Sequence, residues 1–197
     1  MSSSISPPLP HGHRRELPGD LAMWFFILAE LLVFGVFFLA YAFARMRNVE
    51  LFNASQLELD RLSGAINTVL LISSSYFVVR AVDHIRHGRS RACAHWLLAA
   101  MTLGGAFLVV KMAEFIAKTE AGISMSTNTF YMFYLGLGFF HFMHVVLGMV
   151  ILGAVTLKAW KGGYSATDHV GVETGAAYWH MVDLVWIILF PLIYVLH

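Results

Sequence analysis

The sequence predicts an all-α membrane protein, a polytopic bundle of five transmembrane helices in one domain. Hydrophobic residues make up 58% of its 197 residues and charged residues only 13%, whereas a soluble domain has about 25% charged residues. The apolar residues also gather in long stretches, and a membrane-spanning helix needs about 20 of them. Five stretches meet this requirement: residues 21–44, 62–82, 93–117, 128–157 and 175–196.

The charged residues between these stretches predict an orientation, because basic residues collect on the cytoplasmic side of a membrane. With the N-terminus inside and the C-terminus outside, the cytoplasmic side holds Arg14, Arg15, Arg80, Arg86, Arg89, Arg91, Lys158 and Lys161. The outer side then holds only Arg45, Arg47, Arg61 and Lys118. Residues 1–20 are polar and Pro-rich and lack the apolar core of a cleavable signal. We therefore expect a retained, flexible tail before a single domain over residues 21–197.

Composition and missing motifs exclude several classes of function. A net charge of +1 argues against nucleic-acid binding, which favours a basic surface. Cys93 is the single cysteine, so neither a disulfide framework nor a Cys-rich metal site can form within the chain. The sequence has no Gly-rich phosphate loop, no HExxH and no nucleophile elbow. Catalytic chemistry of the kinds found in soluble enzymes is therefore not expected.

Ionisable residues inside the apolar stretches are the candidate functional groups, since such residues are costly at membrane depth. Glu30 lies mid-span and has no partner on its own helix. It is either a neutral packing acid, bonded to another helix or to water, or a group that handles protons or contacts lipid. Lys111 and Glu114 are three residues apart, a same-face spacing that predicts a local ion pair.

Histidines and acids near the C-terminus form a second group of candidates. His141 and His144 share one face of the fourth stretch. Glu173, His180 and Asp183 fall on one side of the fifth, if its helix begins early enough to include Glu173. A haem shared by two histidines is disfavoured, because His141 lies near the bilayer centre and His180 near the inner surface. A metal ion on His144, His180 and Asp183 is conceivable but not required. Hydrogen-bonded structural histidines are the alternative.

Small and polar residues in the spans indicate close helix packing. They are Asn67, Ser73, Ser74, Ser75, Gly104, Gly105, Gly136, Gly138, Gly148 and Gly153.

Four blocks of sequence resemble subunit III of haem–copper (cytochrome c type) oxidases. PGDLAMWFFILAELLVFGVFFLAYAF is similar to that family's glutamate-bearing helix, and AINTVLLISSS to the next one. GFFHFMHVVLG matches its His-x-x-His helix, and VETGAAYWHMVDLVW its C-terminal block. The blocks follow the family's order from about Pro18 to the C-terminus, and four matches in that order argue against a chance resemblance.

The resemblance implies a subunit of the bacterial inner membrane that has no redox centre of its own. Its implied partners are subunit I, which holds the haems and copper, and the neighbouring subunits. Its implied roles are to stabilise that subunit, hold structural phospholipid and maintain proton uptake. Matching the family motifs residue by residue assigns buried structural, lipid-related or proton-related positions to Glu30, Glu114, His141, His144, Glu173, His180 and Asp183. None of these is a redox ligand in the family.

The resemblance also contains one departure and leaves alternatives open. The commonest family form has seven helices, and this chain lacks the first two, which places a closed lipid cleft in doubt. Short members accompany bacterial terminal oxidases or nitric oxide reductases, so an accessory protein of a nitric oxide reductase is one alternative. The others are a haem-binding, cytochrome b-like anchor and a small proton-coupled carrier, although carriers tend to show paired halves.

Overall fold

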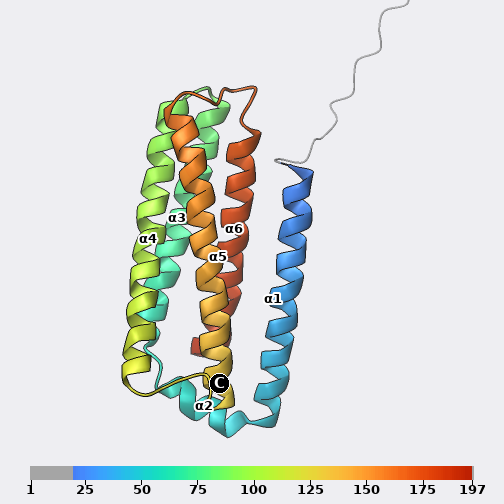
Figure 1. Ribbon diagram of the computed structural model, residues 1–197, viewed down its shortest axis with the longest axis vertical. Coiled ribbons are helices and arrows are strands. Elements are labelled where there is room, and N and C mark those ends of the chain that lie inside the picture. Colours follow the sequence, from blue (N-terminus) through green and yellow to red (C-terminus); the bar gives the residue numbers. More distant parts are fainter. Residues whose placement is uncertain (1–19, 197) are drawn as a thin grey trace, which may run out of the picture.

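The computed structural model describes residues 20–196, and every regular element in this range is helical (Figure 1). The elements are α1 (Leu21–Arg47), α2 (Val49–Leu57), α3 (Arg61–Arg86), α4 (Ser90–Glu120), α5 (Thr129–Trp160), α6 (Val170–Phe190) and the π-helical segment η1 (Pro191–Val195). Five helices are long and apolar enough to cross a membrane: α1, α3, α4, α5 and α6 continued by η1. The predicted all-α bundle of five membrane helices is therefore confirmed for this part of the chain.

Capping residues mark where several of the helices begin. Asp60 precedes α3 and accepts hydrogen bonds from the backbone N–H groups of Leu62 and Ser63. A hydrogen bond from the Ser63 side chain to Asp60 lowers the pKa of this exposed carboxyl. Asn128 caps α5 in the same way. Hydropathy marks the edge of the hydrocarbon layer, whereas the cap marks the end of the helical backbone.

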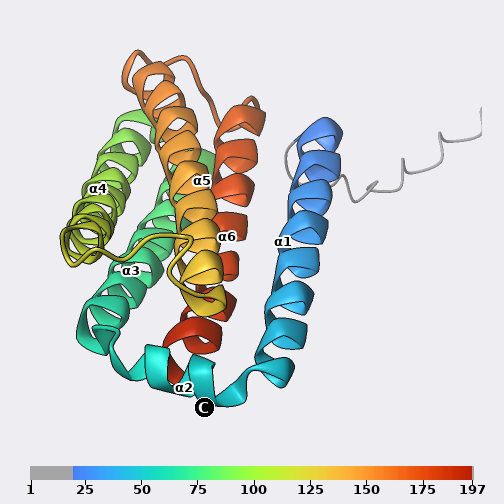
Figure 2. The same ribbon diagram turned by 60° about the horizontal axis from the view of Figure 1, so that its bottom comes forward.

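The short helix α2 was not predicted, because residues 45–61 contain too few apolar residues for a span. It lies across one end of the bundle, beneath the C-terminal segment (Figure 2). Phe52 and Gln56 are fully buried on its inner side. The α2 helix therefore closes this end of the bundle and joins α1 to α3.

Helices α3, α4, α5 and α6 form the compact part of the bundle, whereas α1 stands to one side (Figures 1 and 2). Close packing among the four depends on glycines that face the indole ring of Trp179. A Cβ atom at Gly104 would lie 2.7 Å from this ring, and one at Gly148 would lie 2.8 Å from it. The indole N–H of Trp179 donates to Ser74 of α3, 3.1 Å away. Trp179 thus ties α6 to α3, α4 and α5.

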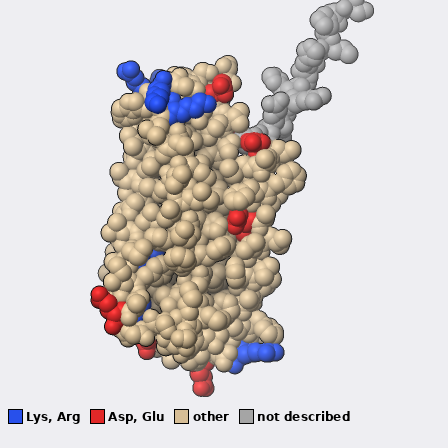
Figure 3. All heavy atoms as spheres, in the orientation of Figure 1, with Lys and Arg blue, Asp and Glu red and all other residues tan. Residues whose placement is uncertain are grey.

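Charged side chains gather toward the two ends of the molecule, with a broad and largely uncharged face between them (Figure 3). Arg86, Arg89 and Arg91 lie at the α3–α4 connection, and Lys158 and Lys161 at the α5–α6 connection. Figure 1 shows both connections at the end where α1 begins. The described C-terminal segment lies at the opposite end, beside α2 (Figure 2).

Candidate functional site

Glu30 of α1 and His144 of α5 meet at membrane depth. Glu30 Oε2 lies 3.0 Å from His144 Nε2. The other ring nitrogen, Nδ1, lies 2.7 Å from the backbone carbonyl of Phe140. The aromatic rings of Phe34 and Phe140 pack against the imidazole, with centroid separations of 5.1 and 4.5 Å. The acid that has no partner on its own helix therefore has one on another helix.

The hydrogen bonds of His144 define how many protons this pair holds. A carbonyl oxygen can only accept, so Nδ1 carries a proton and donates it to Phe140. One further proton then lies between Nε2 and the carboxyl group. It belongs either to a neutral acid facing a neutral imidazole or to an imidazolium facing a carboxylate. In both arrangements the Glu30–His144 pair is neutral overall, which suits an apolar environment.

A second ionisable cluster lies deep in the compact part of the bundle, and we call it the Lys111–Glu114 cluster. Lys111 Nζ lies 3.0 Å from Glu114 Oε2 and 2.6 Å from the hydroxyl of Tyr194. The hydroxyl groups of Tyr134 and Tyr194 both donate to Glu114 Oε1. Three donors thus converge on Glu114, the hydrogen-bonding environment of a carboxylate. The Lys111 ammonium also faces four aromatic rings, those of Phe115, Tyr134, Trp186 and Tyr194, at 5.0–5.6 Å.

His141 occupies a different environment from His144, although both lie on α5. Its ring stacks on Trp186 at a centroid separation of 5.3 Å and meets the edge of Phe107 at 5.8 Å. Only 1% of the residue is exposed. Neither ring nitrogen has a hydrogen-bond partner among the residues that the structure describes. The two histidines predicted on one face therefore divide between a paired position and an unpaired one.

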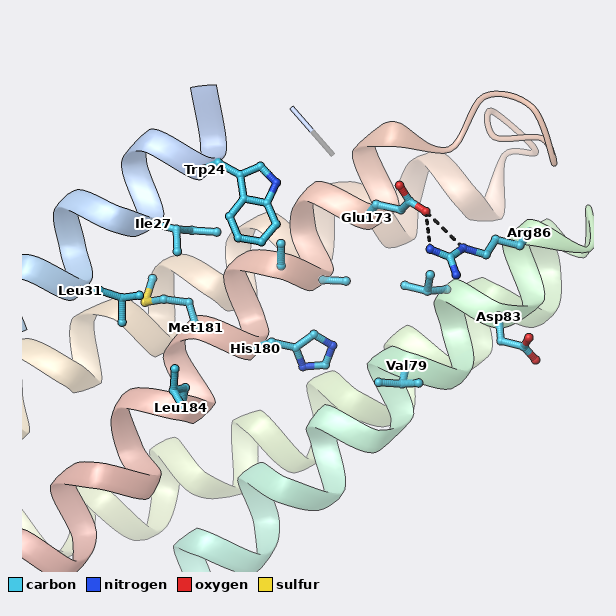
Figure 4. Close-up of a pocket in the computed structure, with 13 residues that line it drawn as sticks. Trp24, Ile27, Leu31, Val79, Asp83, Arg86, Glu173, His180, Met181 and Leu184 are labelled. Atoms are coloured by element: carbon cyan, nitrogen blue, oxygen red, sulfur yellow. Dashed lines mark hydrogen bonds and ion pairs between the residues drawn. The ribbon is translucent and has the colours of Figure 1, made fainter. Parts of the chain in front are cut away.

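A groove of about 590 Å³ lies between α1, α3 and α6, and we call it the α1–α6 groove. In Figure 4, Trp24, Ile27 and Leu31 of α1 face Met181 and Leu184 of α6 across it. Its volume is within the range of roughly 300–1,000 Å³ that is typical of small-molecule sites. The walls are apolar over most of their length, so the groove suits an apolar ligand or an acyl chain.

Polar groups line the end of the α1–α6 groove near the α3–α4 connection. Arg86 Nε and Nη2 lie 3.2 and 2.8 Å from Glu173 Oε1 (Figure 4). His169 Nε2 lies 3.4 Å from the same oxygen. Asp83 and His180 also line the groove. Both positively and negatively charged side chains are therefore present at one end of the otherwise apolar α1–α6 groove.

The predicted stripe of Glu173, His180 and Asp183 divides between different surroundings. Glu173 pairs with Arg86, whereas His180 Nδ1 lies 2.6 Å from the hydroxyl of Ser75 in α3. Asp183 is buried beside Ser75, and its Oδ1 atom lacks a partner in the described part of the chain. The three residues share a side of α6, but they do not act as one site.

The residues considered for a metal are also held apart. His144 bonds to Glu30 and Phe140, and His180 bonds to Ser75. Within residues 20–196 no group of three or more His, Cys, Asp or Glu side chains is placed to hold a metal ion. The conceivable site on His144, His180 and Asp183 is therefore not assembled.

Sequence reasoning missed the polar contacts that fasten the C-terminal segment. The side-chain amide of Gln56 donates to the backbone carbonyls of Ile193 at 2.9 Å and Leu192 at 3.4 Å. The hydroxyl of Tyr41 donates to the Leu192 carbonyl at 3.1 Å. Pro191 offers one available signal, because a proline near the end of a helix interrupts its regular hydrogen bonds.

Comparison with known proteins places this arrangement in one family. Residues 19–197 match the family described as cytochrome c oxidase subunit III. The chain is 33% identical over 200 aligned positions to cytochrome c oxidase subunit 3 of Synechocystis sp., covering 100% of this chain and 84% of the relative. It is 32% identical over 197 positions to the protein of the same name from Thermostichus vulcanus, covering 99% and 96%.

A third relative belongs by name to a quinol oxidase. Quinol oxidase subunit 3 of Bacillus subtilis is 26% identical over 182 positions, covering 89% of this chain and 86% of the relative. The matched range contains all five membrane helices, the Glu30–His144 pair and the Lys111–Glu114 cluster. The chain therefore belongs to the cytochrome c oxidase subunit III family, in a five-helix form.

Proposed function

We propose that this chain supports the catalytic subunit of a haem–copper cytochrome c or quinol oxidase and takes no direct part in its redox chemistry. The observation that carries this proposal is the family match over residues 19–197. The membrane-depth groups agree with it, because Glu30 and His144 bond to one another, and so do Lys111 and Glu114. Such contacts serve packing and proton holding rather than haem or copper ligation.

The partner in this proposal is subunit I, which holds the haems and copper, together with its neighbouring subunits. Relatives are named as subunits of both cytochrome c and quinol oxidases, so either donor fits. We place the chain in a bacterial cell membrane with its N-terminus in the cytoplasm. Arg86, Arg89 and Arg91, with Lys158 and Lys161, then lie on the cytoplasmic side, as the positive-inside rule favours.

Structural phospholipid is proposed for the α1–α6 groove. The apolar walls suit an acyl chain, and the end that holds Arg86, Glu173 and Asp83 suits a polar headgroup. Mass spectrometry of the purified complex tests this. An Ala177→Phe substitution, which narrows the groove, should remove one bound lipid, whereas Gly105→Phe, on an open face of α4, should remove none. Equal lipid content in both variants would contradict the assignment.

Glu30 is proposed to be the neutral, protonated member of the Glu30–His144 pair. Separated charges at membrane depth carry a larger desolvation cost than a neutral acid bonded to a neutral imidazole. A protonated carboxyl at this position would affect local hydration and lipid contact, and through them the proton uptake of the neighbouring subunit. The motivating observation is the 3.0 Å contact between the part-buried Glu30 and His144, whose Nδ1 already donates to the Phe140 carbonyl.

Isolation of the chain from its native membrane in a gentle detergent tests the proposed function. We expect a haem–copper subunit I to accompany it, and we expect the separated chain to show no Soret absorption band. Migration of the chain alone would contradict the subunit assignment. A Soret band in the separated chain would instead support the cytochrome b-like alternative.

A further inference from the structure

The core around Trp186 holds an unusual concentration of polar atoms that lack protein partners. Both side-chain atoms of the Asn67 amide and both ring nitrogens of His141 are buried, and none has a hydrogen-bond partner among residues 20–196. Both residues are almost fully enclosed, with 0% and 1% exposure. A buried polar group without any partner loses its hydrogen bonds to water and gains none in return, so four such atoms require an explanation.

Trp186 contacts His141 directly and bonds to the residue that follows Asn67 in the sequence. His141 stacks on the Trp186 ring. The indole N–H donates to Thr68, which directly follows Asn67 on α3, at 3.0 Å. The Lys111 ammonium lies 5.6 Å from the centre of the same ring. The His141 nitrogens therefore belong to a ring that shares Trp186 with the Lys111 ammonium, and Asn67 lies one residue before the Trp186 partner Thr68.

Lys111 itself has hydrogen-bonding capacity left. An ammonium group has three N–H bonds, and Glu114 and Tyr194 accept two of them in the described part of the chain. The side chain of Lys111 also passes over Gly138, one turn before His141, because a Cβ atom there would lie 3.7 Å from Lys111 Cε. His144, in contrast, has both nitrogens occupied by Phe140 and Glu30.

We propose that ordered water molecules occupy the core beside Trp186 and connect His141 and Asn67 to the Lys111 ammonium. Water supplies both a donor and an acceptor, which a neutral imidazole and an amide each require. Globular proteins hold roughly one buried water per ~27 residues, usually on polar groups of this kind. This hydrated core extends the Lys111–Glu114 cluster to His141 of α5 and Asn67 of α3.

Magnetic-resonance detection of water at His141 tests the proposal in the lipid-reconstituted oxidase complex with ¹⁵N-labelled histidine. Polarisation transferred from water protons should reach the His141 ring nitrogens, and a His141→Phe variant should lose that signal. His144, whose nitrogens both have protein partners, serves as the internal reference. A His141 signal no stronger than that of His144 would overturn the proposal.

A pair of substitutions supplies a second readout. If shared water is present, Asn67→Leu and His141→Phe should each lower the thermal stability of the complex, and the double variant should lose less than the sum, because both remove the same water network. If the core is dry, replacing these unpartnered groups with apolar ones should raise the stability. Higher stability in both single variants would therefore contradict the proposal.

Discussion

Helix α1 and the α3–α6 bundle differ in how much of each is buried. In the apolar membrane-spanning part of α1 only 11% of the residues are buried, whereas 56% are buried in that of α6 and η1. The α3–α6 bundle depends on close contact between glycines and aromatic rings, as at Gly104 and Trp179. Helix α1 has few buried residues, such as Phe34, whose ring packs against Phe140. Polar contacts also join it to the bundle along its length: Asp20 with Thr174, Glu30 with His144, and Tyr41 with Leu192. The comparison separates a packed scaffold from a helix that it positions, with the α1–α6 groove between them.

The largest effect should follow from breaking the ion pair in the scaffold. Lys111→Met leaves the Glu114 carboxylate buried without its cation, which should lower the free energy of unfolding by about 3–5 kcal/mol. Denaturant titration of the purified protein measures this. Lys118→Met is the matched control, because Lys118 is only half-buried and its bond to the Glu58 backbone carbonyl is exposed. The double variant Lys111→Met/Glu114→Gln should recover much of the loss, and a single variant as mild as the control would contradict the role of the pair.

Packing within the scaffold gives the next largest effect. Gly104→Ala would place a methyl group 2.7 Å from the buried Trp179 ring, and the strain should cost about 1–3 kcal/mol. The neighbouring Gly105 provides the control, since a Cβ atom there meets nothing within 4 Å. Gly105→Ala should leave stability unchanged or raise it, because alanine favours helix over glycine by about 1 kcal/mol. Equal stability of the two variants would show that contact with Trp179 is not limiting.

The connection between the two regions can be tested at α2. Gln56→Leu removes the donor to the carbonyls of Ile193 and Leu192, which should cost about 1 kcal/mol. Hydrogen exchange should rise in residues 191–196 and stay unchanged in α4. Leu57→Ala, at an exposed position of the same helix, is the control. Unchanged exchange in the C-terminal segment would remove Gln56 from this role.

The smallest effect on stability is expected at α1. Glu30→Gln keeps a hydrogen-bond donor toward His144, so a neutral pair should lose less than about 1 kcal/mol. Carbodiimide labelling provides the functional readout, because this reagent attacks protonated carboxyl groups. The wild-type chain should be labelled at Glu30, and the variant should not. A wild-type chain that resists labelling would indicate a charged and salt-bridged Glu30.

Much of the scaffold was predictable from the sequence because span length and hydropathy are properties of single segments. The stretch predicted at residues 62–82 lies within α3, whose helical backbone runs from Arg61, after the Asp60 cap, to Arg86. Helix α2 escaped prediction because a short helix at the end of a bundle needs few apolar residues. Its buried positions, Phe52 and Gln56, acquire meaning only through the C-terminal segment that they contact.

Pairings between distant residues were less predictable than the helices themselves. Lys111 and Glu114 share a turn, so their proximity follows from helical spacing. Glu30 and His144 are 114 residues apart, and only the packing of α1 against α5 brings them together. The separation of His141 from His144 has the same origin: one faces Trp186 in the core, and the other faces α1. Helix periodicity groups residues on one helix but cannot say which neighbour each one meets.

The most direct test of a supporting role follows the activity of the oxidase complex through sustained turnover, with and without this chain. A supporting subunit should leave the initial rate and the haem absorption of the complex nearly unchanged, while its removal shortens the active lifetime. Adding the purified chain back should restore that lifetime. An immediate loss of activity with loss of haem, or a lifetime unaffected by removal of the chain, would contradict this account.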